Sequence, residues 1–242
     1  MNLIIDIGNT RVKTAVFEED KIIKHYIFNK SRLLSEMKII VKNHQINEAI
    51  IASVSSISEK KLAKLNNLVT LRQASQQLQL PFKNLYATPK TLGVDRMALV
   101  FGAVMMYPNQ NVLIIDAGTC ITFDFVNKQK EYLGGAISPG IEMRYKALHK
   151  FTFKLPLLQI NKPLHFIGNS TNESIHAGVV NGVIQEIEGV IQQYKNKYLH
   201  LTVVLTGGDA NFLSKQLKSS IFANQNFLLE GLNKMLIFNK NK

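Results

Sequence analysis

The sequence predicts an α/β protein made of two related half-domains with a cleft between them. An apolar run that ends in Asp6-Ile7-Gly8 opens the chain, and a similar run that ends in Asp116-Ala117-Gly118 recurs near its middle. Each glycine is followed closely by a threonine, Thr10 or Thr119, and then by a second alternating apolar stretch. This pattern is typical of a strand, a tight turn and another strand. Because the chain carries the pattern twice, we expect a duplicated fold with one such turn in each half.

The first half, residues 1–109, begins with strands and then alternates strands with helices, which is the order of elements in an α/β domain. Short β-branched runs predict the strands, and apolar residues at helical spacing predict the helices. A polar, turn-rich loop at residues 86–96 precedes a very apolar helix that Pro108 ends. The predicted strands are residues 4–7, 14–17, 22–28 and 49–54, and the predicted helices are residues 33–43 and 95–107.

The second half, residues 110–242, restarts with a strand at Val112. Residues 134–140 contain three glycines and predict a glycine-rich loop. A long helix is predicted at residues 170–194, where Ser170 and Glu173 have the spacing of a capping box. A strand at residues 201–205, the turn at residues 206–209 and a further helix complete this half.

Composition narrows the class of protein. The chain has 242 residues, of which 46% are hydrophobic and 19% charged, so it can bury a sizeable core. No apolar run is long enough to span a bilayer, and the early Asp6 argues against a signal peptide. The single cysteine excludes an intramolecular disulfide and a thiol cluster for zinc. We therefore expect a soluble cytoplasmic protein with no membrane partner.

The net charge of +12 raises the question of anionic partners. Nucleic acid and small anionic substrates both fit such a charge. The basic residues are mostly lysines and are scattered, without a long basic run or an aromatic-interleaved patch. Solvated surface explains them better than a nucleic-acid interface does.

The two Asp-x-Gly turns are the first candidate site. Backbone N–H groups in such a turn can form an anion-binding nest, and Thr10 and Lys13 can add a hydroxyl donor and a charge. Asp6 is a hard oxygen ligand of the kind that Mg²⁺ prefers. The alternative is an ordinary hairpin in which the aspartate only forms the turn. A single copy would favour that alternative, whereas two copies with matching flanks favour a nucleotide site.

Two further motifs carry polar residues at the ends of loops. Gly93-Val94-Asp95-Arg96 lies where the polar loop enters the apolar helix, so Asp95 either stabilises the helix dipole or belongs to a site on the loop. Thr206-Gly207-Gly208-Asp209 follows a buried strand. Its glycines would let a flat ligand pack on the backbone, or Asp209 would simply cap the next helix.

Five motifs occur along the chain in the order Asp6-x-Gly8-Asn9-Thr10, Gly93-x-Asp95-Arg96, Asp116-x-Gly118-Thr119-x-x-Thr122-x-Asp124, Gly134-Gly135 with Pro139-Gly140, and Thr206-Gly207-Gly208-Asp209-Ala210. Together they resemble the motifs of the type III pantothenate kinases, which share the actin-like, sugar-kinase and chaperone-ATPase superfold. The resemblance covers nearly the whole chain and implies two ribonuclease H-like half-domains. The ending Phe227-Leu228-Leu229-Glu230-Gly231-Leu232 is also similar to that of the family.

The resemblance implies roles for individual residues. Asp95 matches the catalytic base, Asp116 the ligand of a monovalent cation, K⁺ or NH₄⁺, and Asp6 a less certain ligand of Mg²⁺. Thr119 matches a contact to ATP. The expected ATP-phosphate loop is Asp6, Ile7, Gly8, Asn9, Thr10, Arg11, Val12 and Lys13, and the expected pantothenate contacts are Tyr86, Gly93, Val94, Asp95, Arg96 and Thr171.

The implied reaction is phosphoryl transfer from ATP to the primary hydroxyl of pantothenate, the first step of coenzyme A biosynthesis. Asp95 would accept the hydroxyl proton, and Arg96 would orient the substrate. The resemblance also implies a homodimer, for which the apolar residues 151–160 are a candidate surface. Arg11 and Lys13 make the first turn more basic than in many family members.

Two other readings stay open at this point. One is a kinase of the same superfold that acts on a sugar or another small acid, and Tyr86 with residues 93–96 argues against it. The other is a non-catalytic transcription-accessory relative. The presence of Asp6, Asp95 and Asp116 favours a catalyst over that reading.

Overall fold

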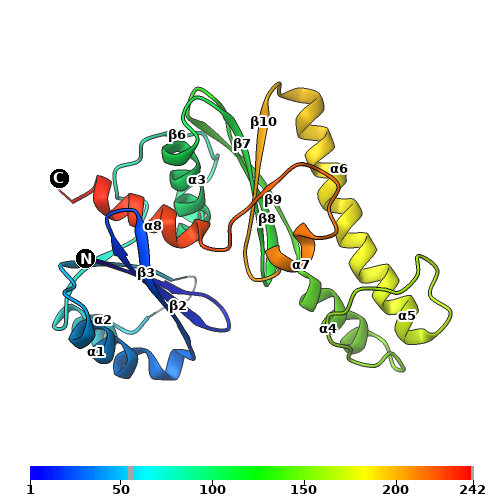
Figure 1. The fold of residues 1–242 in the computed structure, drawn as a ribbon, viewed down its shortest axis with the longest axis horizontal. Coiled ribbons are helices and arrows are strands. Elements are labelled where there is room, and N and C mark those ends of the chain that lie inside the picture. Colours follow the sequence, from blue (N-terminus) through cyan, green and yellow to red (C-terminus); the bar gives the residue numbers. More distant parts are fainter. Residues whose placement is uncertain (54–56, 241–242) are drawn as a thin grey trace. The chain divides into compact units, whose positions relative to one another are not determined.

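The structure, a computed structural model, describes residues 1–53 and 57–240 and divides into two compact units (Figure 1). Unit 1 comprises residues 1–108, 130–132 and 226–242, and unit 2 comprises residues 109–129 and 133–225. Residues 130–132 and the C-terminal segment thus belong to unit 1, although they lie in the predicted second half. The half-domain boundary at residues 109/110 and the cleft between the halves stay predictions.

Unit 1 is built on a five-stranded sheet in the order β3-β2-β1-β4-β5. The first three strands are antiparallel neighbours, and β4 and β5 continue the sheet in parallel with β1. The first four strands agree with the predicted ones, except that the predicted end of the fourth, Val54, lies outside the described residues. The strands are β1 (Asn2–Ile7), β2 (Val12–Glu18), β3 (Lys21–Phe28), β4 (Glu48–Ser53) and β5 (Thr70–Gln73).

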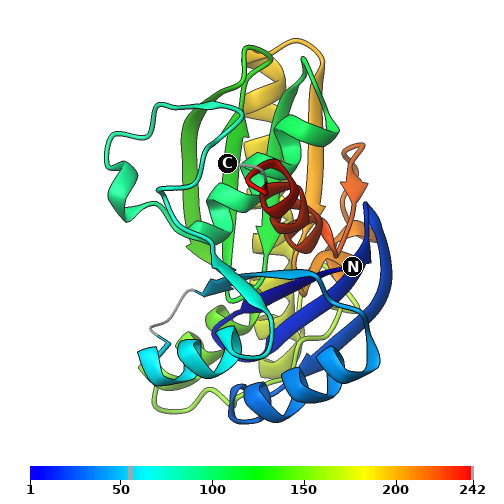
Figure 2. The same cartoon turned by 90° about the vertical axis from the view of Figure 1, so that its left-hand side faces the viewer.

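Helices cover both faces of this sheet. On one face, Leu3, Ile5 and Ile7 of β1 form a core with α1 (Leu33–Asn43) and α2 (Glu59–Asn66). On the other face lie α3 (Val94–Met106) and α8 (Phe227–Phe238), which pack side by side in Figure 2. The helix predictions for residues 33–43 and 95–107 are confirmed to within one residue.

Unit 2 repeats the same strand order. Five strands of its six-stranded sheet run β9-β8-β7-β10-β11, with the short β6 beyond β9, so both sheets place these five strands in the order third, second, first, fourth, fifth. This agreement confirms the predicted duplication. The strands are β7 (Asn111–Ala117), β8 (Cys120–Val126), β9 (Glu131–Pro139), β10 (Leu201–Thr206) and β11 (Phe222–Ala223), and the two-residue β6 (Lys83–Asn84) pairs with the beginning of β9 within unit 1.

The predicted glycine-rich loop at residues 134–140 is wrong, because most of it is strand β9. A Cβ on Gly135 would lie 1.6 Å from the carbonyl oxygen of Phe123 in the neighbouring strand. The glycine therefore permits a close approach of two strands. Sequence alone cannot distinguish this use of glycine from a loop.

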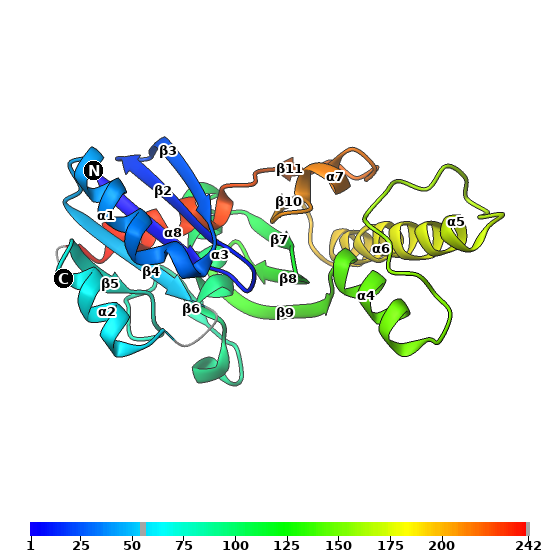
Figure 3. The same ribbon diagram turned by 90° about the horizontal axis from the view of Figure 1, so that it is seen from below.

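Helices pack on one face of the unit 2 sheet. The predicted long helix is present as α5 (Thr171–His176), a π-helical segment η3 (Ala177–Asn181) and α6 (Gly182–Lys197), which Figure 3 shows as one continuous coil. This coil and α4 (Ile141–Phe151) cover Leu113, Ile115 and Phe123 of the sheet. The short helix α7 (Ala210–Ser214) follows β10. No helix among the described residues is long and apolar enough to cross a membrane.

Candidate functional site

Asp6 is buried at the end of β1, on the sheet face that α3 and α8 cover. Side chains alternate along a strand, so Asp6 shares a face with Asn2. The Asn2 side-chain amide donates to Asn233 of α8 at 3.0 Å, which identifies that face. Only 7% of Asp6 is exposed, and burial raises the pKa of its carboxyl from 3.8 to about 6.

Two charged neighbours act on the Asp6 carboxyl in opposite directions. Lys13 is directly opposite Asp6 in the antiparallel ladder of β1 and β2, so both side chains lie on one face. Its charge lowers the pKa of Asp6, and the negative charge of Asp95 raises it. The structure therefore brings Asp6, Lys13 and Asp95 together in unit 1, as a nucleotide and substrate site requires.

Asp95 lies in the first turn of α3, and its carboxylate has a defined position. The Oδ1 atom accepts the backbone N–H of Arg96 at 2.8 Å. A Cβ on Gly93 would lie 2.3 Å from the same Oδ1, so any larger residue there would displace the carboxylate. This contact gives a physical reason for the Gly93-x-Asp95 spacing.

Arg96 and Tyr86 form the next part of the site. Only 6% of Arg96 is exposed, and its guanidinium carbon lies 5.6 Å from the centre of the Tyr86 ring. This geometry is that of a cation–π pair. The Tyr86 N–H donates to the Asn84 side chain at 3.0 Å, which fixes the backbone of the loop.

The first Asp-x-Gly turn is open to solvent at its tip. Asn9, Thr10 and Arg11 are exposed, and Lys13 is half-buried. The Gly8 N–H donates to the Arg11 carbonyl at 3.1 Å, so this amide closes the turn. The expected anion contacts therefore fall to the residues after Gly8.

In unit 2, Asp116 has a different set of neighbours from Asp6. The register places Thr122 of β8 and Thr206 of β10 directly beside it, on the same face of the sheet. The Thr122 hydroxyl donates to the buried Asp124 carboxylate at 3.2 Å, so the lone pairs of its oxygen stay available. Oxygen donors of this kind suit a hard cation.

Two further loops pack against the Asp116 turn. The Gly140 N–H donates to the Thr119 carbonyl at 3.1 Å, and the Asp209 N–H donates to the Ala117 carbonyl at 3.0 Å. Gly207 has φ +98°, and a Cβ there would lie 2.4 Å from the Asp116 carboxylate. The second copy of the turn is therefore held by the two glycine motifs that follow it in the sequence.

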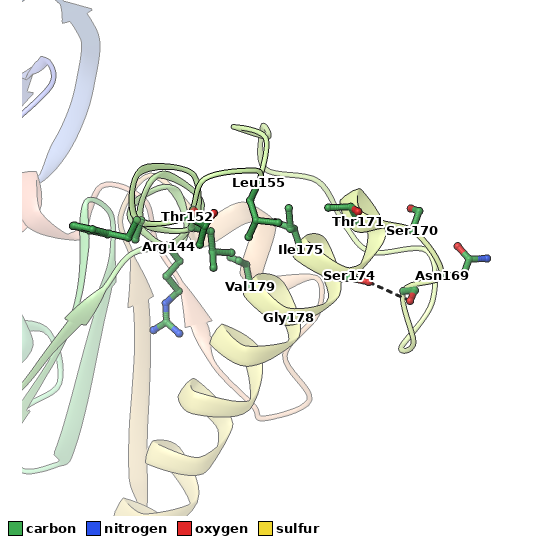
Figure 4. Close-up of a pocket in the computed structure, with 14 residues that line it drawn as sticks. Arg144, Thr152, Leu155, Asn169, Ser170, Thr171, Ser174, Ile175, Gly178 and Val179 are labelled. Atoms are coloured by element: carbon green, nitrogen blue, oxygen red, sulfur yellow. Dashed lines mark hydrogen bonds between the residues drawn. The ribbon is translucent and has the colours of Figure 1, made fainter.

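Thr171 lies apart from the Asp116 turn, in a pocket of about 1180 Å³ between α4 and α5 (Figure 4). Leu155 and Ile175 lie next to each other on its wall, and neither Asp116 nor Thr119 lines it.

The predicted capping box at Ser170 and Glu173 is confirmed in one of its two hydrogen bonds. The Ser170 hydroxyl accepts the Glu173 N–H at 3.3 Å, but the Glu173 carboxylate accepts the Leu164 N–H at 3.3 Å.

Sequence reasoning missed the partners that strand register supplies. The sequence places Thr206 only in a turn and Lys13 only in the ATP-phosphate loop. Their positions opposite Asp116 and Asp6 depend on which strands pair and in which register. Among the described residues, no group of three or more His, Cys, Asp or Glu side chains could hold a metal ion.

The two units with one strand order define the fold, and solved structures of low sequence identity share it. A solved structure from Campylobacter jejuni, assigned to the Baf family of transcriptional activators, is similar with a TM-score of 0.67 and 20% identity over 99% of this chain and 100% of that chain. The activator of the 2-hydroxyisocaproyl-CoA dehydratase from Clostridium difficile, with bound ADPNP, gives a TM-score of 0.56 and 11% identity over 99% and 94%.

Sequence comparison then identifies the family of this chain. The family model described as type III pantothenate kinase matches residues 2–193, and the chain belongs to this family. A type III pantothenate kinase of Christiangramia forsetii is 50% identical over 99% of both chains. That of Flavobacterium psychrophilum is 48% identical over 99% of this chain and all of the relative. The resemblance found in the motifs is thus confirmed.

Proposed function

We propose that this protein transfers the γ-phosphoryl group of ATP to the primary hydroxyl of pantothenate and forms 4'-phosphopantothenate, the first step of coenzyme A biosynthesis. The observation that carries the proposal is the grouping of Asp6, Lys13 and Asp95 beside the Arg96–Tyr86 pair in unit 1. Membership of the type III pantothenate kinase family supports the substrate.

In this proposal Asp95 is the general base. Its carboxylate is half-buried at the start of α3, and a backbone N–H fixes one of its oxygens. A base held in this way takes the hydroxyl proton as the phosphoryl group is transferred, which contributes roughly 10²–10⁴-fold to the rate. Arg96 presents a planar fork that suits the carboxylate of pantothenate or the transferring phosphoryl group.

ATP occupies the first Asp-x-Gly turn in this proposal. The exposed tip from Asn9 to Arg11 and the cation of Lys13 receive the phosphates. The Asp6 carboxyl fits a position near Mg²⁺, because it is the buried oxygen ligand at the end of β1. Mg²⁺ supplies charge neutralisation on the phosphates when bound. The solved Clostridium difficile activator of similar fold holds ADPNP, which agrees with a nucleotide at this fold.

A monovalent cation, K⁺ or NH₄⁺, binds at Asp116 in this proposal. The Thr122 and Thr206 side chains beside Asp116 add neutral oxygens to its single carboxylate. Asp6 has Lys13 in the place that Thr122 takes beside Asp116, so the first turn has a cation for the phosphates where the second has a neutral hydroxyl. The chemical difference between the copies supports different roles, with Thr119 as a nucleotide contact.

A pantothenate-dependent ADP-release assay tests the reaction. We expect ADP release to require pantothenate and to rise with K⁺ or NH₄⁺ at constant ionic strength, and not with Na⁺. Pantetheine and hexoses serve as the substrate panel. Turnover on a hexose in preference to pantothenate would contradict the substrate, and equal rates in Na⁺ and K⁺ would remove the cation from Asp116. Absence of kinase activity, together with salt-dependent DNA binding, would favour the transcription-accessory alternative.

A homodimer is the assembly that we propose, with its interface on the segment between α4 and α5. Phe153 and Phe166 are 101% and 85% exposed, and Leu164 and Ile167 are also largely exposed. So many large apolar side chains in one short segment are typical of an interaction surface. Sedimentation should give a dimer, and a Phe153→Ser, Phe166→Ser variant should give a folded monomer. We also propose that the protein acts in the cytoplasm.

A further inference from the structure

Tyr132 has no part in the site as described so far, yet the structure holds it beside the substrate loop. It is the second residue of β9, belongs to unit 1 and is completely buried. Asn84 of β6 is its partner in the parallel ladder, and the Leu85 N–H donates to the Tyr132 carbonyl at 3.0 Å. The next residue along that loop is Tyr86.

The Tyr132 ring belongs to a continuous stack that ends at Arg96. Its ring is stacked with that of Tyr86, with centroids 6.0 Å apart and an interplanar angle of 20°. The Phe82 ring meets Tyr132 edge-on, with centroids 6.4 Å apart. The Arg96 guanidinium in turn lies 5.6 Å from the Tyr86 ring. The buried rings of Phe82 and Tyr132 thus support the half-buried ring on which Arg96 rests.

Arg96 depends on such support for its orientation. A guanidinium binds carboxylate or phosphate through a planar fork, so the plane of the group determines which oxygens it meets. The backbone N–H of Arg96 is already bonded to Asp95, which fixes the main chain but leaves the side-chain torsions to be set by packing. The Tyr86 ring is one of the groups that hold the Arg96 side chain, and Tyr132 limits the tilt of Tyr86.

We propose that Tyr132 is a positioning residue for phosphoryl transfer to pantothenate. Through Tyr86, it fixes the plane of the Arg96 guanidinium, so its effect appears in the handling of pantothenate and not of ATP. The inference rests on the proposed substrate roles of Arg96 and Tyr86. The aromatic ring of Tyr132 makes the contact with Tyr86 on which this role depends.

The first experiment compares Tyr132→Leu with Tyr132→Phe. Loss of an aromatic pair and loosening of a cation–π contact should raise the KM for pantothenate about three- to tenfold in Tyr132→Leu, with the KM for ATP unchanged. Tyr132→Phe keeps the ring and should raise the KM for pantothenate clearly less than Tyr132→Leu does. The matched control is Tyr198→Leu, which removes a ring stacked on Tyr194 in unit 2 at a centroid distance of 6.1 Å and should leave both KM values unchanged. Circular dichroism checks the fold of each variant.

The second experiment separates failure of this inference from failure of the proposed function. In an Arg96→Met background, Tyr132→Leu should have no further effect on kcat/KM for pantothenate, because the two residues act as one unit. Equal effects of Tyr132→Leu in both backgrounds, or as large a rise in KM with Tyr132→Phe as with Tyr132→Leu, would overturn the positioning role. An Arg96→Met enzyme with unchanged kcat/KM would instead refute the substrate role of Arg96. Tyr132→Met replaces Tyr132→Leu in the same cycle if the leucine variant does not fold.

Discussion

The buried carboxyl of Asp6 predicts an unusual effect of a conservative substitution: Asp6→Asn should abolish activity and yet stabilise the fold near neutral pH. Burial raises the pKa of Asp6 from 3.8 to about 6, against the opposing effect of Lys13. An ionised Asp6 is therefore unfavourable in the folded protein. Asparagine has nearly the same shape and carries no charge, so the variant escapes that cost.

The magnitude follows from linkage between protonation and folding. A pKa about two pH units higher in the folded state than in the unfolded chain corresponds to ~3 kcal/mol at 1.36 kcal/mol per unit. The folded protein binds the proton more tightly, so this contribution to the free energy of unfolding is full below the unfolded pKa of 3.8 and is lost as pH rises to about 6. Asp6→Asn has no such loss, so at pH 7.5 its free energy of unfolding should exceed that of the parent by up to ~3 kcal/mol, which raises Tm by about 6–12 °C.

Urea unfolding followed by circular dichroism from pH 4 to pH 8 provides the assay. The two proteins should be nearly equal in stability at pH 4, diverge up to about pH 6 and then run parallel, with the variant more stable. A difference that does not depend on pH, or a variant less stable than the parent at pH 7.5, would refute the reasoning. Lys13→Met in the parent should lower stability at pH 7.5, because it removes the cation that favours ionised Asp6.

Three further predictions concern the other parts of the site. Gly93→Ala should lower kcat at least tenfold with little change in Tm, because its Cβ would displace the Asp95 carboxylate. The control is Gly189→Ala on α6, where a Cβ meets nothing within 4 Å, and it should keep full activity. A normal kcat in Gly93→Ala would contradict this prediction. Asp116→Asn should lose the stimulation by K⁺ in the ADP-release assay, and retention of the full K⁺ response would exclude Asp116 as a ligand. Phe153→Ser alone should weaken the dimer at least tenfold in sedimentation equilibrium, and an unchanged dissociation constant would place the interface elsewhere.

The sequence predicted the fold well where local signals are strong. The helix at residues 33–43 agrees with the structure at both ends, and the duplicated strand turns led directly to the duplicated sheet order. The loop predicted at residues 134–140 is wrong because the reason for Gly135 is the nearness of Phe123, which is a tertiary contact. The π-helical segment η3 inside the long helix left no signal in the apolar spacing.

The site itself could be predicted only in part. The sequence marks Asp95 as a candidate, but its role as base rests on the resemblance to a family, because a carboxylate in the first helical turn is common. All six residues of β1 are buried, so no alternation of apolar and polar residues reveals which face Asp6 occupies. Its nearness to Asp95 follows from the packing of α3 on that face, and the role of Tyr132 follows from pairing of β6 with β9. These are long-range contacts that a single sequence does not encode locally.

The measurement that tests the central claim most directly is pantothenate-dependent ADP release by Asp95→Asn beside the parent enzyme, with ATP binding measured in parallel. The account predicts that kcat falls at least a hundredfold while ATP binds with the parent's affinity, because asparagine keeps the shape of the residue but cannot accept the proton. A folded Asp95→Asn enzyme that phosphorylates pantothenate at the parent's rate would contradict it.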